Sequence, residues 1–563
     1  MKALPDWLRR YQSAWLAGDM TAGLIVTVML IPQSLAYALL AGLPPEVGLY
    51  ASILPMLAYA LIGSSMTLAV GPVAVASLMT ASALQPLAAS GSAEYVAMAV
   101  QLSLLSGAML LAFGALRLGF LAHFLSHPVI SGFITGSAVL IAVGQLKHLM
   151  GVQVAGNNVF ETIHALVNAI AQTNPVTFLL GLGSVVFLWA ARRFLATALS
   201  KMGVSAKAAE LASKLAPMVA VIVSTALVAV FRLDETAGVS VVGAVPQGLP
   251  GFGFPMPDWS ALGPLWLPAL LISLVGFVES VSVAQSLALK REQRIKPDRE
   301  LLGLGAANVA SALSGGYPVT GGFARSVVNF SAGANTPLAG VISAALMAMV
   351  IAWMTGLFHY LPHAVLAATI IVAVSSLVDT KTFKEAWHYD RADAFSLLAT
   401  ALGVVAFGVE AGILMGVALS LGVLVWRSSH PHMAVVGRVP GTEHFRSVER
   451  HRVETVPGLL ALRVDESLYF ANAALVEDHV ESLLVQDPSI KRVLLACAAV
   501  NQIDATALGV LTQMEHSLRK RGIELALAEV KGPVMDRLKD TLLGKTLEGR
   551  IYLSLHEAFE ART

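Results

Sequence analysis

Charged side chains are scarce in this sequence: Asp, Glu, Lys and Arg make up only 13% of the 563 residues, whereas hydrophobic residues make up 56%. The mean hydropathy is +0.71. A water-soluble chain of this length would need much more charge to cover its surface. The composition therefore predicts an α-helical polytopic membrane protein.

Several other features are missing. The single cysteine, Cys497, excludes an intrachain disulfide framework. The sequence contains no Walker loop, no GxSxG nucleophile elbow and no HExxH motif, so nothing indicates an ATP-driven pump or an enzyme. His123 and His127 are four residues apart but lack a third ligand nearby. We expect no metal and no cofactor, and the net charge of +1 gives no sign of a nucleic-acid partner.

Charge is concentrated at the end of the chain, where residues 431–563 hold 16 of the 37 Lys and Arg residues. We therefore predict a transmembrane domain over residues 20–430 and a soluble domain over residues 443–563. Residues 1–19 form a short N-terminal segment. Lys2, Arg9 and Arg10 lie in this segment, but no small-residue cleavage site follows, so we expect no removable signal peptide.

The long uncharged runs divide into about fourteen spans of roughly 20 residues each, seven before the polar stretch 232–258 and seven after it. With a cytoplasmic N-terminus, 18 Lys and Arg residues fall inside the cell and only Lys147 and Arg232 fall outside. This topology places the C-terminal domain in the cytoplasm. Because seven is odd, the second set of spans is inverted relative to the first, as in the inverted repeats of secondary transporters.

Two similar segments occupy the third span of each half, VGPVAVAS at 70–77 and GYPVTGGFARS at 316–326. Each contains a Pro-Val pair, and we expect a short helix to begin there because proline suits the first helical position. Paired half-helices direct their N-termini, each carrying roughly +0.5 charge, toward the middle of the membrane. Free backbone N–H groups at such ends bind anions.

Arg325 is the only Lys, Arg, Asp or Glu between Leu301 and Val378. It would lie one turn inside the second short helix. An unpaired arginine at the centre of a bilayer costs at least about 3 kcal/mol, so this side chain should face a polar cavity. We interpret it as part of an anion site; the alternative is a guanidinium that snorkels or braces neighbouring carbonyl groups.

Three further polar residues lie within predicted spans. Glu279, in the first span of the second half, is a buried carboxyl that can carry a proton; the alternative is a structural carboxyl that anchors serine or backbone groups. Gln33 and Tyr37 share one face of the first span. They offer a polar contact and an aromatic wall to a substrate, or alternatively hydrogen bonds between helices.

Several motifs together resemble the sulfate permease (SulP) anion transporters, relatives of prestin and pendrin. They are DMTAGLIVTVMLIPQSLAYALLAGLPPEVGLY, GGYPVTGGFARSVVNFSAGANTPLAG and the C-terminal domain. The resemblance implies two inverted repeats of seven spans that form a core and a gate domain, a homodimer, and an elevator-like movement of the core against the gate. It also implies a substrate anion held by the matching positions, which are Gln33, Tyr37, Val73, Ala74, Phe323, Ala324, Arg325 and Ser326. At Glu279 it implies coupling to a cation.

In the C-terminal domain, short apolar runs alternate with helical patterns. GLLALRV, KRVLLAC and IELALAE predict strands, and TALGVLTQMEHSLRKRG predicts a helix. This alternation indicates a small α/β domain, and it resembles a STAS domain. Asp504 and Thr506 match the phosphorylation loop of that fold, although Ala505 replaces a serine. Thr506 is therefore a candidate regulatory site, or alternatively a helix cap.

The sequence favours a proton-coupled transporter of a small oxyanion, with sulfate as the first candidate, in the inner membrane of a bacterium. Bicarbonate or dicarboxylate exchange is the alternative within transport. An anion channel, or a membrane-anchored sensor that signals through its STAS domain, is the alternative outside it. The expected partners are the anion, the proton, membrane lipid and a second copy of the chain.

Overall fold

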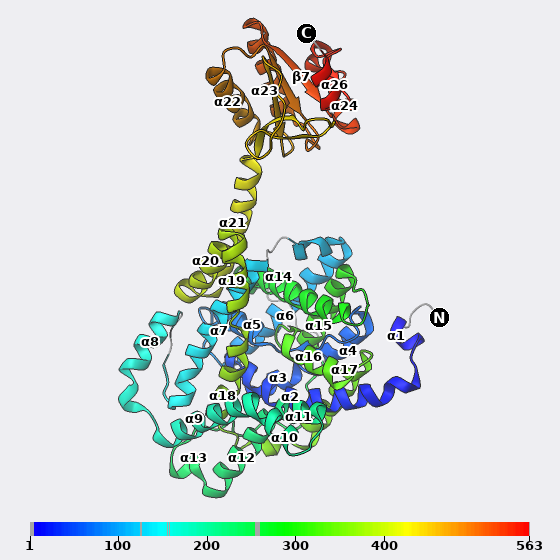
Figure 1. The fold of residues 1–563 in the computed structure, drawn as a ribbon. Coiled ribbons are helices and arrows are strands. Elements are labelled where there is room, and N and C mark those ends of the chain that lie inside the picture. Colours follow the sequence, from blue (N-terminus) through cyan, green and yellow to red (C-terminus); the bar gives the residue numbers. More distant parts are fainter. Residues whose placement is uncertain (1–4, 124–126, 155, 157, 254–258, 562–563) are drawn as a thin grey trace. The chain divides into compact units, whose positions relative to one another are not determined.

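A computed structural model describes residues 5–123, 127–154, 156, 158–253 and 259–561 of the chain. The chain separates into two compact units, residues 1–420 and 421–563 (Figure 1). The first unit is almost entirely helical, and the second combines helices with a sheet.

The elements of the first unit are α1 Asp6–Arg9, η1 Ser13–Trp15, α2 Leu16–Leu40, α3 Pro45–Tyr50, α4 Leu54–Ile62, β1 Val70–Gly71, α5 Ala74–Leu84, α6 Ala93–Ala115, η2 Leu118–His123, α7 His127–Met150, α8 Val159–Asn168, η3 Ile170–Gln172, α9 Pro175–Ala190, η4 Ala191–Leu195, α10 Ala196–Lys201, α11 Ala206–Lys214, α12 Ala216–Phe231, α13 Leu233–Thr236, α14 Trp259–Leu289, α15 Pro297–Leu313, β2 Thr320–Gly321, α16 Phe323–Ala332, α17 Leu338–Trp353, η5 Thr355–Phe358, α18 His363–Val374, η6 Ser375–Leu377, α19 Thr380–Tyr389, α20 Arg391–Phe407 and α21 Val409–Ser429, the last of which continues into the second unit.

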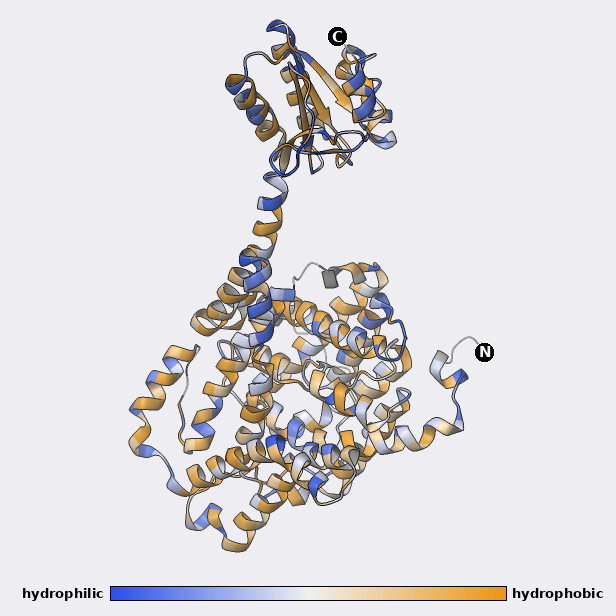
Figure 2. Ribbon diagram, in the orientation of Figure 1, coloured by the Kyte–Doolittle hydropathy of each residue, from blue (hydrophilic) through white to orange (hydrophobic). Residues whose placement is uncertain are grey.

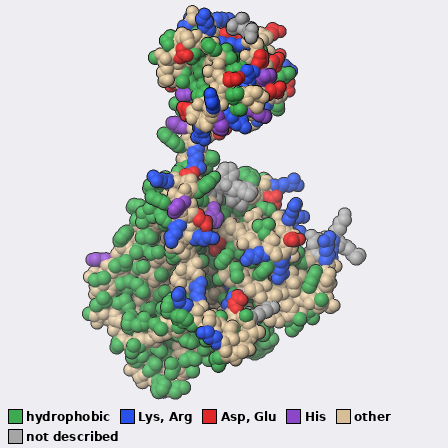
Figure 3. Space-filling model, in the orientation of Figure 1, with side chains coloured by type: hydrophobic (Ala, Val, Ile, Leu, Met, Phe, Trp, Pro, Cys, Tyr) green, Lys and Arg blue, Asp and Glu red, His purple; other side chains and the backbone are tan. Residues whose placement is uncertain are grey.

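The helices of the first unit are apolar along most of their length (Figure 2). Among the described residues, eight helical segments are long and apolar enough to cross a membrane, and α5, α12 and α17 are shorter apolar helices. Large hydrophobic side chains such as Leu179, Val186 and Val230 are exposed on α9 and α12, in a region that is covered by hydrophobic side chains in Figure 3. Such a surface suits lipid rather than water. The number of fourteen spans stays a prediction, because several segments are divided into short helices.

Two short helices lie at the positions expected from the sequence. Helix α5 has 11 residues and α16 has 10, so each is about 15 Å long, half the thickness of the hydrocarbon core. A two-stranded antiparallel sheet joins them, with Val70 opposite Gly321 and Gly71 opposite Thr320. The expected position of the prolines is wrong: Pro72 precedes the N-cap of α5, and Pro318 precedes β2 rather than beginning α16.

Helices α6 and α15 approach each other closely because both carry glycine at the contact. A Cβ atom on Gly107 would lie 3.0 Å from the carbonyl oxygen of Gly305, and a Cβ atom on Gly305 would lie 3.0 Å from the carbonyl oxygen of Gly107. Small residues at such contacts allow close helix packing in membranes. This contact fixes the position of α15, whose Asn308 side chain forms hydrogen bonds with Val319 next to β2.

The elements of the second unit, after α21, are β3 Met433–Arg438, β4 Phe445–Ser447, β5 Leu459–Val464, α22 Ala473–Gln486, β6 Arg492–Ala496, α23 Ala505–Lys520, β7 Glu524–Ala528, α24 Gly532–Leu538, α25 Leu542–Thr546, β8 Ile551–Tyr552 and α26 Leu555–Glu560. The six strands form one sheet in the order β4-β3-β5-β6-β7-β8. Strands β5, β6, β7 and β8 are parallel, and β3 is antiparallel to both of its neighbours.

The two faces of this sheet carry different side chains, as the alternation of a strand requires. Leucine and valine of β5, β6 and β7 pack against α22 and α23 on one face. Alanines of the same strands, such as Ala461, Ala496 and Ala528, pack against α26 on the other. The strands and helices predicted from the sequence are present, and the sheet begins at β3, upstream of residue 443, where the sequence analysis places the start of the domain.

Candidate functional site

The paired strands bring the N-termini of α5 and α16 together. Val73 is the N-cap of α5 and Gly322 is the N-cap of α16, and neither helix has a side-chain cap. The first N–H groups of both helices therefore lack side-chain acceptors. An anion between the two helices would satisfy these donors and interact favourably with both helix dipoles.

Arg325 is the third residue of α16, and its side chain is only 3% exposed. Both terminal nitrogens, Nη1 and Nη2, are buried without a hydrogen-bond partner. A Cβ atom on Gly71 would lie 2.9 Å from Nη1, and a Cβ atom on Gly322 would lie 3.1 Å from Nε. The guanidinium thus lies against the turns that lead into both short helices, and the two glycines leave room for it.

Burial of a charge without a partner destabilises a protein by several kcal/mol. A bound anion would compensate the charge of this guanidinium. No carbonyl of the described residues accepts a hydrogen bond from its terminal nitrogens, which argues against the alternative that it braces carbonyl groups. The side chains of Tyr37, Tyr317 and Glu279 lie close enough to interact electrostatically with it. The surroundings of the guanidinium therefore contain a single acidic side chain among the described residues.

That acidic side chain, Glu279 on α14, makes no ion pair with Arg325 within 4 Å. Its Oε2 atom is buried and has no hydrogen-bond partner among the described residues. The side chain borders a small apolar cavity of about 20 Å³ between α7 and α14, which Phe133 and Val278 also line. No serine or backbone group within the described chain anchors the carboxyl.

The other predicted residues lie on α2 and at the N-termini of α5 and α16. Tyr37 is 9% exposed and Gln33 is half-buried, and neither side chain makes a hydrogen bond within the described chain, so we find no hydrogen bond of theirs between helices. Val73 and Ala74 are buried at the start of α5. Phe323 is 51% exposed and Ala324 is also exposed. The first two residues of α16 are therefore accessible, whereas those at the start of α5 are not.

Ser326 is fully buried. Its hydroxyl accepts a hydrogen bond of 2.9 Å from the Ala69 N–H and donates one of 2.7 Å to the Gly322 carbonyl. It therefore joins α16 to the residue before β1. We treat Ser326 as a positioning residue of the site rather than as a substrate contact.

Sequence reasoning missed two residues that hold β2 in place. Ser280 Oγ accepts a 2.9 Å hydrogen bond from the Gly321 N–H and shares a 2.7 Å hydrogen bond with Thr320 Oγ1. Asn308 on α15 accepts from the Val319 N–H and donates to the Val319 carbonyl, both at 2.9 Å. The available signal was weak, because each is one of several polar residues on its helix and nothing local distinguishes it from the others.

Tyr317 is a further residue whose role the sequence does not predict. It is fully buried, and its hydroxyl shares a 2.9 Å hydrogen bond with Ser77 on α5. This contact joins the segment before β2 to the first turn of α5. It fixes the two short helices relative to each other beyond the strand pair itself.

In the second unit, Asp504 is the N-cap of α23. Its carboxylate accepts hydrogen bonds from the Ala507 N–H at 2.8 Å and from the Phe470 N–H at 2.9 Å, and the first of these is the main reason that its pKa lies below the usual range. Thr506 is exposed in the first turn. The alternative that Thr506 caps the helix is wrong, because Asp504 does so. Cys497 is buried in this unit, which raises the pKa of its thiol to about 12.

Comparison with known proteins gives consistent matches over both units. Residues 16–400 match the sulfate permease family, and residues 450–558 match the STAS domain. A probable sulfate transporter of Mycobacterium tuberculosis is 36% identical over 556 residues, which cover 98% of this chain and 96% of the relative. Chloroplastic sulfate transporter 4.1 of Arabidopsis thaliana is 34% identical, over 93% of this chain and 76% of the relative. The structure of the murine solute carrier 26 family member A9 anion transporter in its inward-facing state superimposes with a TM-score of 0.90 and 21% identity, over 99% of this chain and 93% of that one.

Proposed function

Because the chain belongs to the sulfate permease family, we propose that it is a secondary active transporter that takes up sulfate together with protons. Membership makes it a transporter and not an enzyme, and its C-terminal unit contains a STAS domain. The prediction of a helical polytopic membrane protein with such a domain is confirmed. Sulfate is the substrate named for the relatives, and the site is suited to it.

The observation that carries the proposal is the unpaired guanidinium of Arg325 between two helix N-termini. Arg325 contributes +1, and each helix N-terminus contributes roughly +0.5, so the local charge is about +2. This charge matches a divalent oxyanion. The oxygens of sulfate would accept from backbone N–H groups at Val73, Ala74, Phe323 and Ala324, beside Gln33 and Tyr37.

Glu279 supplies the proposed coupling. With its carboxylate ionised the local charge falls to about +1, and with it protonated the charge returns to about +2. Protonation therefore favours sulfate binding, and by linkage sulfate binding favours protonation to the same extent. Loss of the proton on the side with higher pH then promotes release of the anion. The inward proton gradient thereby drives accumulation.

The movement we propose is an elevator-like displacement of a core domain against a gate domain. The pairing of β1 with β2, together with Tyr317, Ser280 and Asn308, supports it, because these contacts join α5 and α16 into one body. A site built in this way moves as a unit. We further propose that the protein is a homodimer in the lipid of a bacterial inner membrane, with residues 1–19 and the STAS domain in the cytoplasm.

The decisive measurement is uptake of labelled sulfate into proteoliposomes, with and without an inward proton gradient. We expect gradient-driven, saturable uptake by the wild type. Glu279→Gln should lose the effect of the gradient but still exchange sulfate for sulfate. Glu385→Gln, which alters an exposed carboxyl on α19, is the control and should behave as wild type.

Each other outcome points to an alternative. Flux that does not saturate would indicate a channel, and sulfate binding without flux would indicate a sensor. Absence of sulfate flux under every gradient would overturn the sulfate assignment and lead to bicarbonate and dicarboxylates, with Arg325 still expected to hold the anion.

A further inference from the structure

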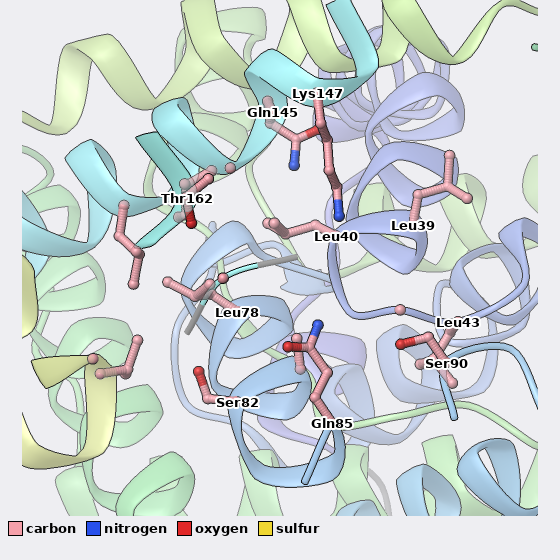
Figure 4. Close-up of a pocket in the computed structure, with 18 of the residues that line it drawn as sticks. Leu39, Leu40, Leu43, Leu78, Ser82, Gln85, Ser90, Gln145, Lys147 and Thr162 are labelled. Carbon is pink, nitrogen blue, oxygen red and sulfur yellow. The ribbon is translucent and has the colours of Figure 1, made fainter. Parts of the chain in front are cut away.

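A large cavity lies beside the proposed anion site, between α2, α5 and α7 (Figure 4). Its volume is about 550 Å³. A second cavity of about 490 Å³ lies along α7, α9 and α18. Lys147 and His148, in the last turn of α7, line both cavities, so these two side chains stand between them.

The first cavity starts one helical turn from the anion site. Its lining includes Leu78, which follows Ala74 by one turn of α5, and Leu40, which follows Tyr37 by about one turn of α2. It extends along α5 to Gln85. An ion at the end of the cavity lined by Leu78 and Leu40 is therefore about one helical turn from the first turn of α5, while still outside the site itself.

Lys147 gives this cavity its charge. Its ammonium points into the cavity (Figure 4), and it has no hydrogen-bond or ion-pair partner in the described part of the chain. No Asp or Glu is among the described residues that line either cavity. The positive charge is thus uncompensated in a confined space, where low-dielectric walls strengthen its attraction for an anion.

The second cavity offers further donors. The imidazoles of His148 and His363 lie 6.1 Å apart, centre to centre, in an edge-to-face arrangement. His363 begins α18, and His363 and Ala364 both line the cavity, so the positive end of this helix lies at its wall. The His363 N–H itself donates a 3.0 Å hydrogen bond to the Ser240 carbonyl. The first cavity adds further donors, which are the hydroxyl of Ser82 and the side-chain amides of Gln85 and Gln145.

From these observations we infer that Lys147 is the centre of a second anion site, a vestibule that binds a small oxyanion before it reaches Arg325. The identity of the anion as sulfate rests on the proposed function, and the position on the outer side rests on the proposed topology. The vestibule raises the local concentration of the anion beside α5. The anion then passes from the vestibule to the site between α5 and α16.

The test uses cysteine modification, which needs no transport. Cys497 is buried, so Gln85→Cys provides the accessible thiol in the cavity of the full-length protein. We would compare the rates of its reaction with anionic and cationic methanethiosulfonates. The ratio of the anionic to the cationic rate should fall about tenfold or more when Lys147→Met is added. In Lys147→Arg this ratio should equal that of Gln85→Cys alone. Sulfate should slow the anionic reaction only in variants that keep a positive charge at position 147.

Arg232→Gln is the control, because Arg232 is an exposed cation that lines neither cavity and pairs with Glu235. It should leave the ratio unchanged. If Lys147→Met also leaves the ratio unchanged, the proposed vestibule is wrong, whether or not the protein carries sulfate. In a sulfate-transporting protein, Lys147→Met should also raise KM for outside sulfate severalfold with little change in the maximal rate. Absence of sulfate flux in the wild type would overturn the proposed function. The rates of cysteine modification would still test the vestibule on their own.

Discussion

The Tyr59 hydroxyl donates a 2.6 Å hydrogen bond to Glu300 Oε2, which joins α4 of the first half of the membrane unit to α15 of the second. Glu300 Oε1 accepts from the Ser64 N–H at 2.8 Å, the Ser64 hydroxyl at 2.6 Å and the Ser65 N–H at 3.0 Å. The side chain is fully buried. These contacts fix the loop that leads to β1, and therefore the approach to the anion site.

We expect Glu300→Gln to destabilise the protein by about 2–4 kcal/mol, because an amide cannot accept all of these hydrogen bonds and leaves buried donors unsatisfied. Thermal unfolding in detergent measures the change. Glu385→Gln replaces an exposed carboxyl and should have little effect. Equal stability of Glu300→Gln and the wild type would show that the carboxylate does not hold this loop.

Replacement of Arg325 by glutamine should remove anion binding without harming the fold. The terminal nitrogens of the guanidinium have no protein partner, so the unfolding temperature without anion should stay the same or rise. The increase in unfolding temperature that sulfate produces in the wild type should disappear. Arg325→Lys keeps the charge but not the planar fork and should respond weakly. A sulfate response of wild-type size in Arg325→Gln would place the anion elsewhere.

Ser280→Ala should weaken sulfate uptake by disturbing β2. The variant leaves the Gly321 N–H without its acceptor, and we expect KM to rise roughly tenfold while expression stays normal. Ser282→Ala is a matched control on the same helix, because its hydroxyl bonds only to the Val278 carbonyl of that helix. If both variants transport with the same KM, β2 does not need Ser280 for its position.

The N-terminal turn of α23 should lose protection in acid. Hydrogen bonds from backbone N–H groups, chiefly that of Ala507, hold the pKa of Asp504 below its unfolded value of about 3.9. The folded state is therefore favoured above about pH 4, and this contribution is lost as the pH falls through the folded-state pKa. Hydrogen exchange of the α23 amides in the full-length protein should be steady from about pH 7 to pH 5, after correction for the intrinsic rate, and faster below about pH 4.

Two variants distinguish the contribution of the N-cap residue Asp504 from that of Thr506. Asp504→Ala should speed this exchange roughly fivefold at neutral pH and abolish its acid dependence. Thr506→Ala should leave both unchanged, since Thr506 is exposed and is not the cap. An acid dependence that survives in Asp504→Ala must come from another group.

The sequence allowed the two short helices to be located because their glycines and prolines interrupt an apolar run that would otherwise span the membrane. Arg325 stood out for the same reason, as a lone charge among apolar residues. The pairing of β1 with β2 could not be predicted, because two residues are too few for any periodicity. Strand β3 was also missed, since its six residues lie before residue 443, where the regular alternation of apolar runs and charged segments begins.

The positioning residues could not be predicted either. Glu300, Ser280 and Asn308 act through partners that are 11 to 241 residues away in the chain, and only the fold shows which donors they meet. A polar residue on an apolar helix has the same local pattern whether it carries a proton, as proposed for Glu279, or supports a strand. The distinction depends on whether its polar atoms are already satisfied.

The antiparallel pairing of β1 with β2 has a consequence for how much of the site can be read from side chains. The ladder of Val70–Gly71 with Thr320–Gly321 is formed by backbone groups, so it depends little on which side chains those positions carry. Gly71 is the exception, because a Cβ atom there would lie 2.9 Å from Arg325 Nη1. The contact that positions both helix N-termini therefore leaves almost no mark on the amino-acid sequence.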